Sequence, residues 1–166
     1  CIDWIFVNYF LPECNGIELL KDLCQLICNA HIVLNSGNDR VELVVEALDQ
    51  GARGFLSKSG SAADVFKCLD KISAGDIYLA PDMQKQVRNY RSTIQEEKKR
   101  ISHQISKRQK EVLLLLSAGY SNAEIATALG ISPHTVKDHV SNIMQLFNAD
   151  NRVHCIAEAR QLGLIC

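Results

Sequence analysis

A run of polar side chains recurs at helical spacing between Pro133 and Phe147. At about 100° per residue, these side chains fall within about a third of a helix circumference, opposite an apolar side. Their donors and acceptors have the reach to contact base edges in the major groove of DNA. The solvated face of an ordinary amphipathic helix gives the same pattern, so both interpretations stay open. The polar face holds His134, Lys137, Asp138, Ser141 and Gln145, and the apolar face holds Val136, Val140, Ile143 and Phe147.

Asn8 is a second polar residue in a place where chemistry is common, because it directly follows the apolar stretch Trp4–Val7. Open sheets of parallel strands hold ligands and reactive groups at the carboxyl ends of their strands. Asparagine is also frequent in turns, where its side chain bonds to nearby backbone groups. Taken alone, Asn8 is better explained as a turn residue.

Short apolar stretches alternate with helical patterns in the N-terminal half of the chain. Such stretches are typical of parallel strands that are covered on both faces, and the alternation predicts an α/β fold with a parallel sheet. A capping box opens the third helix, whose inner face we expect to carry Val65, Leu69 and Ile72. The predicted strands are Trp4–Val7, Ile32–Leu34 and Gly54–Leu56, and the predicted helices are Gly16–Cys28, Arg40–Gln50 and Ser61–Gly75.

Four short helices are predicted after residue 104. Ser121 and Glu124 form a second capping box, and Ser132 followed by Pro133 is a typical helix start. A three-residue turn that begins with Gly130 joins the second and third of these helices. This is the spacing of a helix-turn-helix, in which the second helix contacts base edges. The predicted helices are Lys107–Ala118, Ser121–Leu129, Pro133–Phe147 and Asn151–Leu162.

The polar segment between the two halves, residues 81–103, has no apolar core of its own. Four apolar or aromatic residues recur in it at steps of four, three and four, a spacing that a short coiled coil also shows. A linker helix is the simpler interpretation of so short a pattern. The four residues are Met83, Val87, Tyr90 and Ile94.

Charge is distributed unevenly, although the net charge is only −1. Residues 1–80 carry 6 Lys and Arg against 11 Asp and Glu, whereas residues 81–103 carry 6 against 3 and residues 104–166 carry 6 against 5. A basic C-terminal part is consistent with contact to nucleic acid. Ordinary scatter of surface charge explains the asymmetry equally well.

The 7 cysteines form no CxxC pair, and Cys24 and Cys28 are spaced as in the core of a helix. We therefore predict free thiols, no disulfide, no metal or other cofactor, and a cytoplasmic location. The longest aliphatic run, Val112–Leu116, is far too short to span a bilayer, and no signal peptide is visible. The chain begins with Cys1, and we favour a fragment over a lipid-anchored cysteine because a buried-type strand follows almost at once.

Residues 105–165 resemble the LuxR/FixJ-type four-helix DNA-binding domain along their whole length. The resemblance is carried by "EVLLLLSAGYSNAEIA", "LGISPHTVKDHVSNI" and "NRVHCIAEARQLGL". At Gln109 the family usually has Glu, and we expect a lost polar contact there. The resemblance implies binding of double-stranded DNA. The implied contacts are Lys137, Asp138 and Ser141 in the major groove with His134 and Gln145 on the same face, Thr135 at a phosphate, and Asn122 and Arg152 at the flanking backbone.

Residues 3–80 resemble the C-terminal part of a bacterial receiver domain, the sensor half of response regulators. The matching stretches are "DWIFVNYFLPECNGIELL", "HIVLNSGND" and "GARGFLSKSGSAADVFKCLDKISAGDIYLAPD". The resemblance implies a flavodoxin-like receiver fragment that lacks the first two strands, the helix between them and the acidic pair that binds Mg²⁺. It places Asn8 at the phospho-acceptor position, Ser36 at the switch hydroxyl, Phe55 at the switch aromatic and Lys58 at the catalytic lysine.

The amide of Asn8 is a poor nucleophile and cannot form an acyl phosphate, so we predict a regulator that does not depend on aspartyl phosphorylation. An unknown ligand or protein partner would then replace phosphate as the signal. In the implied strand order 2-1-3-4-5, the strand Trp4–Val7 lacks its neighbour and becomes a sheet edge. We expect this edge to recruit another strand.

Together these features predict a receiver-like domain over residues 1–80, a linker helix over 81–103 and a LuxR-type helix-turn-helix domain over 104–166. The predicted function is a DNA-binding transcription regulator that acts as a homodimer away from any membrane. The alternative is an interaction module or truncated product that dimerises with a partner regulator and need not bind DNA. No nucleophile–base pair or phosphate-binding loop in the sequence favours an enzyme.

Overall fold

The computed structural model describes residues 3–12, 14–27 and 30–165, and it divides into two compact units, Cys1–Arg91 and Ser92–Cys166. Each unit has its own buried apolar core. Cys1, Cys28 and Cys166 lie outside the described residues, as does the predicted helix end at Cys28. In the described part of the chain, no helix is both long and apolar enough to cross a membrane.

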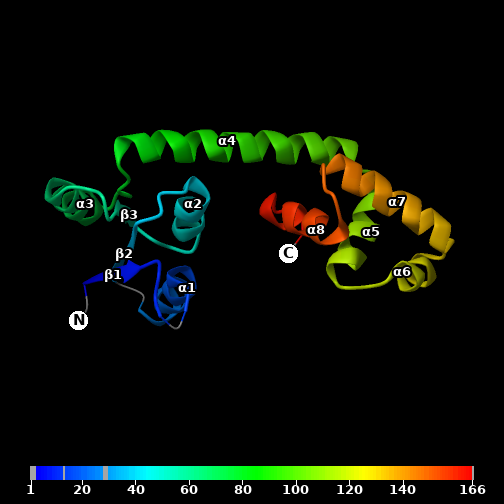
Figure 1. Cartoon of the computed structure of the whole chain (residues 1–166), viewed down its shortest axis with the longest axis horizontal. Helices are drawn as coiled ribbons and strands as arrows, with labels where there is room; N and C mark the ends of the chain where they lie inside the picture. The colour runs from blue at the N-terminus through cyan, green and yellow to red at the C-terminus, as the bar shows by residue number, and fades with distance from the viewer. Residues whose placement is uncertain (1–2, 13, 28–29, 166) are drawn as a thin grey trace. The chain divides into compact units, whose positions relative to one another are not determined.

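The first unit is a parallel three-stranded sheet with helices on both faces, which confirms the predicted α/β class. The central strand β2 pairs with β1 on one side and with β3 on the other. Helices α1 and α2 cover one face of the sheet, and α3 covers the other (Figure 1). In chain order the elements are β1 (Trp4–Asn8), α1 (Gly16–Leu26), β2 (His31–Ser36), α2 (Val41–Asp49), β3 (Gly54–Ser57) and α3 (Ala62–Ser73).

Alternation of side chains along β1 decides which face of the sheet each residue covers. Val7 points into the core under α1 and α2 and is 3% exposed. Trp4 points the other way, into the smaller cluster under α3. Phe6 shares the face of Trp4 and is 47% exposed, so the α3 side of the sheet is only partly covered near β1.

Helix α3 buries a different set of residues from the predicted one. Ile72 is buried as predicted, and Cys68, which was not predicted, is fully buried. Leu69 is half-buried, but Val65 is exposed, so its predicted place on the inner face is wrong. The reason is that α3 contacts β3 and Tyr78 through its Cys68–Ile72 side, which leaves the first turn beyond the covered strands.

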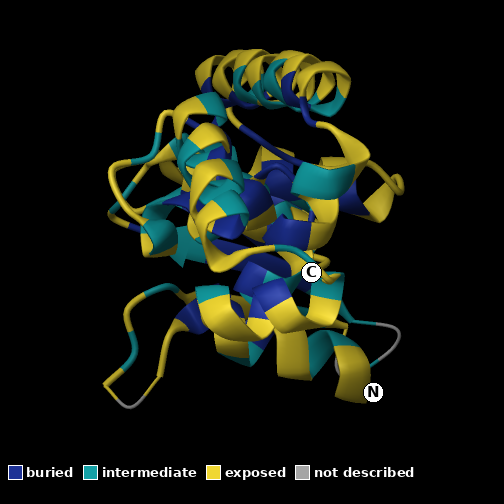
Figure 2. Cartoon of the chain, turned by 90° about the vertical axis from the view of Figure 1, so that its right-hand side faces the viewer, coloured by how far each residue is buried: buried dark blue, intermediate teal, exposed yellow. Residues whose placement is uncertain are grey.

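Helix α4 (Pro81–Gln104) follows, and most of its length is exposed (Figure 2). Met83 and Val87 are nevertheless buried in the core of the first unit, a contact that was not predicted from the sequence. Arg91 adds an ion pair with Asp49 of α2 at 2.5 Å. The packing surface for these residues is built by distant parts of the chain, which explains why local polarity did not reveal it.

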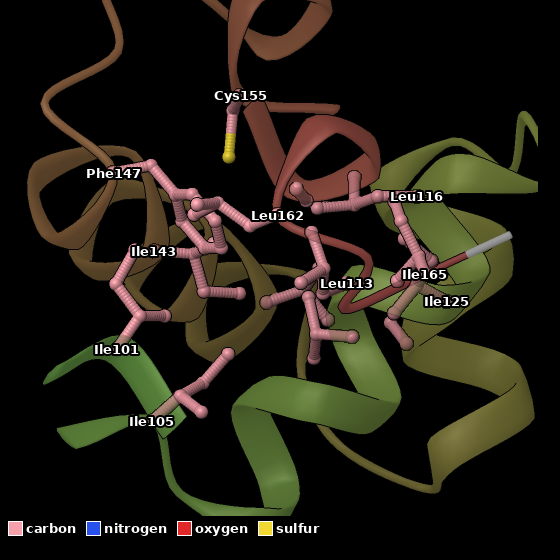
Figure 3. Close-up of a cluster of buried hydrophobic side chains, with 14 residues drawn as sticks. Ile101, Ile105, Leu113, Leu116, Ile125, Ile143, Phe147, Cys155, Leu162 and Ile165 are labelled. Atoms are coloured by element: carbon pink, nitrogen blue, oxygen red, sulfur yellow. The ribbon is translucent and has the colours of Figure 1, made fainter. Parts of the chain in front are cut away.

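The second unit is an all-α domain whose four helices after α4 confirm the predicted four-helix fold. The last turns of α4 belong to its core: Ile101 is 1% exposed and points into the same cluster as Leu113 and Ile143 (Figure 3). The predicted boundary at residue 104 stays a proposal, and Ile101 argues for an earlier start. The helices are α5 (Lys107–Ser117), α6 (Asn122–Leu129), α7 (Pro133–Leu146) and α8 (Arg152–Gln161).

Candidate nucleic-acid interface

The turn between α6 and α7 is fixed at both ends by local hydrogen bonds. Gly130 adopts the left-handed conformation with φ of 64°, which glycine reaches without a steric penalty. The N–H of Ile131 then donates to the carbonyl oxygen of Ala126 at 3.0 Å, which closes the end of α6. Ala126 is also buried in the core of this unit. The turn therefore leads directly from the end of α6 at Leu129 to the start of α7 at Pro133.

The start of α7 is capped by Ser132. Its hydroxyl oxygen accepts the N–H of Thr135 at 3.0 Å and lies 2.9 Å from the Thr135 hydroxyl oxygen. Pro133 occupies the first turn, where its missing N–H costs nothing. The remaining N–H groups and the helix dipole make such a helix start a favourable place for a phosphate group.

The outward face of α7 presents the predicted polar residues. His134, Lys137 and Asp138 are exposed in the first two turns, with Gln145 exposed further on and Ser141 half-buried. His134 Nε2 lies 3.7 Å from Asp138 Oδ2, so these two side chains face each other along the helix. Lys137 has no ion-pair partner within the described ranges and keeps its charge available for a ligand.

Asn142 is exposed on α7 and was not among the residues predicted from the sequence. It lies four residues after Asp138, so the two side chains are neighbours on the helix surface. Its amide carries both donors and an acceptor, the groups that adenine recognition uses. A slightly wider sector of the helical wheel would have included it.

The opposite face of α7 holds the helix in place. Val136 and Ile143 are fully buried, Phe147 is 6% exposed, and Val140 packs half-buried against the same core. The buried face thus orients the polar face toward solvent, as the helical wheel predicted.

Asn122 is the first residue of α6 and is half-buried. The preceding Ser121 donates its N–H to Glu124 Oε2 at 2.7 Å, and Glu124 donates its N–H to the Ser121 hydroxyl at 3.3 Å. This confirms the predicted capping box. The hydrogen bonds from the Ser121 hydroxyl and N–H lower the pKa of the Glu124 carboxyl below its ordinary value.

Arg152 lies at the first residue of α8 and is tied to the end of α5. Its Nη2 atom donates to the carbonyl oxygen of Leu116 at 3.4 Å and to that of Tyr120. The Leu116 carbonyl oxygen also accepts the N–H of Gly119 at 3.1 Å, in the turn that ends α5. The structural role of Arg152 is therefore to hold α8 against α5, and its predicted contact with a nucleic-acid backbone would use the guanidinium N–H groups that remain.

Gln109 completes a capping box instead of losing a polar contact. Its Oε1 atom accepts the N–H of Ser106 at 2.8 Å, and its own N–H donates to the Ser106 hydroxyl at 3.2 Å. The expected loss at this position is therefore wrong, because the amide oxygen of glutamine accepts the same hydrogen bond that a carboxylate would.

The four receiver-type positions of the first unit lie near the carboxyl ends of the strands. Asn8 is exposed at the end of β1, and Ser36 at the end of β2 is 1% exposed. The Ser36 hydroxyl accepts the N–H of Asn38 at 2.9 Å, so it is committed to the local turn. Phe55 is buried in the core under α1 and α2, and Lys58 is exposed just after β3.

Close packing fixes the backbone around Asn8. The start of α1 approaches so closely that a Cβ atom at Gly16 would lie 2.2 Å from the carbonyl oxygen of Asn8. Gly16 also donates its N–H to the carbonyl oxygen of Tyr9 at 2.8 Å. The neighbouring strand contributes Asn35, whose Oδ1 atom is buried and has no hydrogen-bond partner among the described residues.

Residues 103–159 match the family model for bacterial regulatory proteins of the luxR family, and residues 1–70 match the model for response regulator receiver domains. The chain is 30% identical over 177 residues to the transcriptional regulatory protein DegU of Brevibacillus brevis, with 98% of the chain and 75% of DegU covered. The chain belongs to the LuxR-type response regulators.

Another relative of this LuxR-type response regulator is the transcriptional regulatory protein YdfI of Bacillus subtilis (strain 168). The two are 28% identical over 163 residues, which cover 98% of the chain and 76% of YdfI. Among solved structures, the response regulator RcsB of Salmonella typhimurium, studied for conformational dynamism in DNA interaction, superposes with a TM-score of 0.54 over 95% of the chain and 75% of RcsB. At 19% sequence identity, this similarity shows the shared fold alone.

Proposed function

We propose that this response regulator binds double-stranded DNA in a sequence-specific way by inserting α7 into the major groove. The observation that carries the proposal is the contrast between the two faces of α7. Val136 and Ile143 are fully buried, whereas Lys137 and Asp138 on the opposite side are exposed. The second helix of a helix-turn-helix needs a buried apolar face that holds it in place and an exposed polar face that contacts base edges.

The proposed contacts divide into base readers and phosphate binders. Lys137 and Ser141 would donate to base acceptors, and Asp138 would accept from a cytosine amino group. His134 and Gln145 extend the same face. Thr135, at the capped start of α7, would position a phosphate, while Asn122 and Arg152 would contact the flanking backbone.

The receiver-like unit would regulate this activity without aspartyl phosphorylation. The amide of Asn8 cannot accept a phosphoryl group as a carboxylate does, and it presents donors where a metal ion requires oxygen ligands. The signal would instead come from a small ligand or from a protein partner. We propose that the protein acts as a homodimer in the cytoplasm, because DNA sites for helix-turn-helix proteins are commonly two half-sites about one helical turn apart.

An electrophoretic mobility shift with a library of genomic fragments tests the proposal. We expect a discrete subset of fragments to be retained in the presence of excess random DNA. Equal retention of all fragments would leave only non-specific binding. No retention by the folded chain would favour the alternative, an interaction module that acts through a partner regulator.

A further inference from the structure

The last turns of α4 contact the C-terminal end of α7. Ile101 is 1% exposed and belongs to the same buried cluster as Ile143 and Phe147 (Figure 3). Arg100 directly precedes Ile101, and its Nη2 atom donates to the carbonyl oxygen of Leu146 at 3.0 Å. Leu146 is the last residue of α7. Helix α4 therefore supplies both an apolar anchor and a charged donor at this end of α7.

The hydrogen bond from Arg100 completes the end of α7. The last four carbonyl groups of an α-helix have no N–H donor within the helix. Backbone N–H groups of the turn that follows α7 donate to three of them, and Arg100 donates to the fourth, that of Leu146. Its positive charge is also favourable at the negative end of the helix dipole. The three backbone bonds run from Phe147 to Ile143 at 3.0 Å, from Asn148 to Gln145 at 3.1 Å and from Ala149 to Met144 at 2.8 Å.

Two other side chains of α4 hold the guanidinium group in this orientation. Its Nε atom donates to Glu97 Oε2 at 3.0 Å, and Nη2 donates to Oε1 of the same carboxylate at 2.5 Å. Its Nη1 atom donates to Gln104 Oε1 at 3.1 Å. The hydrogen bond from Arg100 lowers the pKa of the Glu97 carboxyl below its ordinary value, so this carboxylate is charged at neutral pH. Every guanidinium nitrogen thus has a partner that keeps Nη2 directed at Leu146.

We infer that Arg100 is a positioning residue for DNA recognition, which fixes the C-terminal half of α7 so that Ser141 and Gln145 keep their places on its polar face. This inference rests on the proposed function of α7. Helix ends fray readily, and a hydrogen bond to a terminal carbonyl opposes fraying. Gln145 directly precedes Leu146, and Ser141 lies about one turn earlier. Lys137 lies near the capped start of the helix, so its position does not depend on Arg100.

A direct contact between Arg100 and a DNA phosphate is the competing role, because the arginine side chain is 44% exposed. Its charge is already paired with Glu97, which favours the positioning role. The two roles predict opposite effects of Glu97→Gln. Loss of the carboxylate charge loosens the guanidinium group and should weaken binding to a specific site if Arg100 positions α7. The same change would strengthen DNA binding if Arg100 contacts phosphate, because it removes a neighbouring negative charge.

Fluorescence anisotropy of the full chain with a DNA site selected from random-sequence duplexes tests the inference. Arg100→Ala should bind the selected site about tenfold more weakly than wild type, and Arg100→Lys should recover part of this loss. The slope of log affinity against log salt should equal that of wild type, because no phosphate contact is lost. A repeated selection with Arg100→Ala should relax the preference at the base pairs that Gln145→Ala also relaxes. The preference at the base pair that depends on Lys137 should remain.

Lys98→Ala is the matched control. Lys98 Nζ donates to the carbonyl oxygen of Gly163 at 3.1 Å, just beyond the end of α8. This variant therefore removes a cation of α4 and a bond at a helix end, but leaves α7 unchanged. It should lower the midpoint of urea unfolding, as Arg100→Ala does, and keep the wild-type base preference.

Three results would overturn the inference while the proposed function stands. They are an Arg100→Ala variant with the wild-type base preference, a loss of preference that is equal at all base pairs, and stronger DNA binding by Glu97→Gln. Wild-type protein that prefers no duplex would refute the proposed function and the positioning role together.

Discussion

The Ser132 hydroxyl accepts the N–H of Thr135 at 3.0 Å, and this hydrogen bond fixes the first turn of α7. Val136 lies four residues after Ser132, is fully buried and anchors the same turn to the core. The Ser132 cap and the buried Val136 thus both stabilise the first turns of α7, where Lys137 and Asp138 are exposed to solvent.

Replacing Ser132 with alanine should destabilise the second unit by about 1 kcal/mol, because the Thr135 N–H loses its acceptor. Ser132→Asn supplies another acceptor at the same position and should retain most of the stability. Urea denaturation followed by circular dichroism measures both. Equal midpoints for wild type and Ser132→Ala would show that the cap contributes nothing to this helix.

Arg152→Ala should lower the free energy of unfolding by about 1–2 kcal/mol, because the carbonyl oxygens of Leu116 and Tyr120 lose a charged donor. It should also weaken DNA binding equally for all sequences if the proposed backbone contact exists. Arg160→Ala removes an exposed arginine from the same helix and should change stability by less than about 0.5 kcal/mol. DNA affinity measured under conditions in which the variant stays folded separates the effect of Arg152 on DNA binding from its effect on stability. Unchanged stability would contradict the role of this residue in holding α8 against α5.

Acetyl phosphate with Mg²⁺ should leave both the mass and the DNA affinity of the protein unchanged. The reason is chemical, since the Asn8 amide cannot form an acyl phosphate. Intact-mass spectrometry before and after incubation is the measurement, with a receiver domain known to autophosphorylate as the positive control. A stable phosphoryl group located at residue 8 would contradict phosphorylation-independent regulation.

Cys68 and Cys155 should resist alkylation in the folded protein. Burial raises the pKa of the Cys68 thiol from 9.0 to about 11, and burial together with the nearby charge of Glu158 raises that of Cys155 to about 11. Two pH units correspond to about 100-fold less thiolate at any pH well below both values. Iodoacetamide at pH 8 followed by peptide mapping should therefore label the exposed Cys14 before either of these two. Labelling of Cys68 or Cys155 at the rate of Cys14 without unfolding would be inconsistent with the cores described.

Signals confined to a few neighbouring residues were predictable from the sequence. The capping box at Ser121 and Glu124 and the cap at Ser132 depend on side chains three residues apart, so the helix starts could be identified without a fold. The polar face of α7 was predictable for the same reason. Its helical period alone decides that Val136 and Lys137 point in different directions.

Contacts between distant parts of the chain were not predictable in this way. Met83 and Ile101 are buried in a largely polar helix because other elements cover them. Val65 fits the apolar period of α3 but lies beyond the strands that this helix covers. The acceptors of Arg152 are backbone carbonyls that more than 30 residues separate from it in the chain, so no local pattern reveals them. These positions depend on tertiary packing, which overrides local pattern.

Sequence-specific DNA binding by α7 is tested most directly by one measurement. Binding sites are selected from random-sequence duplexes, and fluorescence anisotropy then compares the best selected site with its scrambled version for wild type, Lys137→Ala and Lys110→Ala. Lys110 is an exposed lysine on α5 and serves as the charge-matched control. We predict that wild type prefers the selected site at least about 1,000-fold. Lys137→Ala should lose about 1–3 kcal/mol and relax the preference at one base pair, whereas Lys110→Ala should keep the preference intact. Folded wild-type protein that binds the selected and scrambled duplexes with equal affinity would contradict the assignment of α7 as a reading helix.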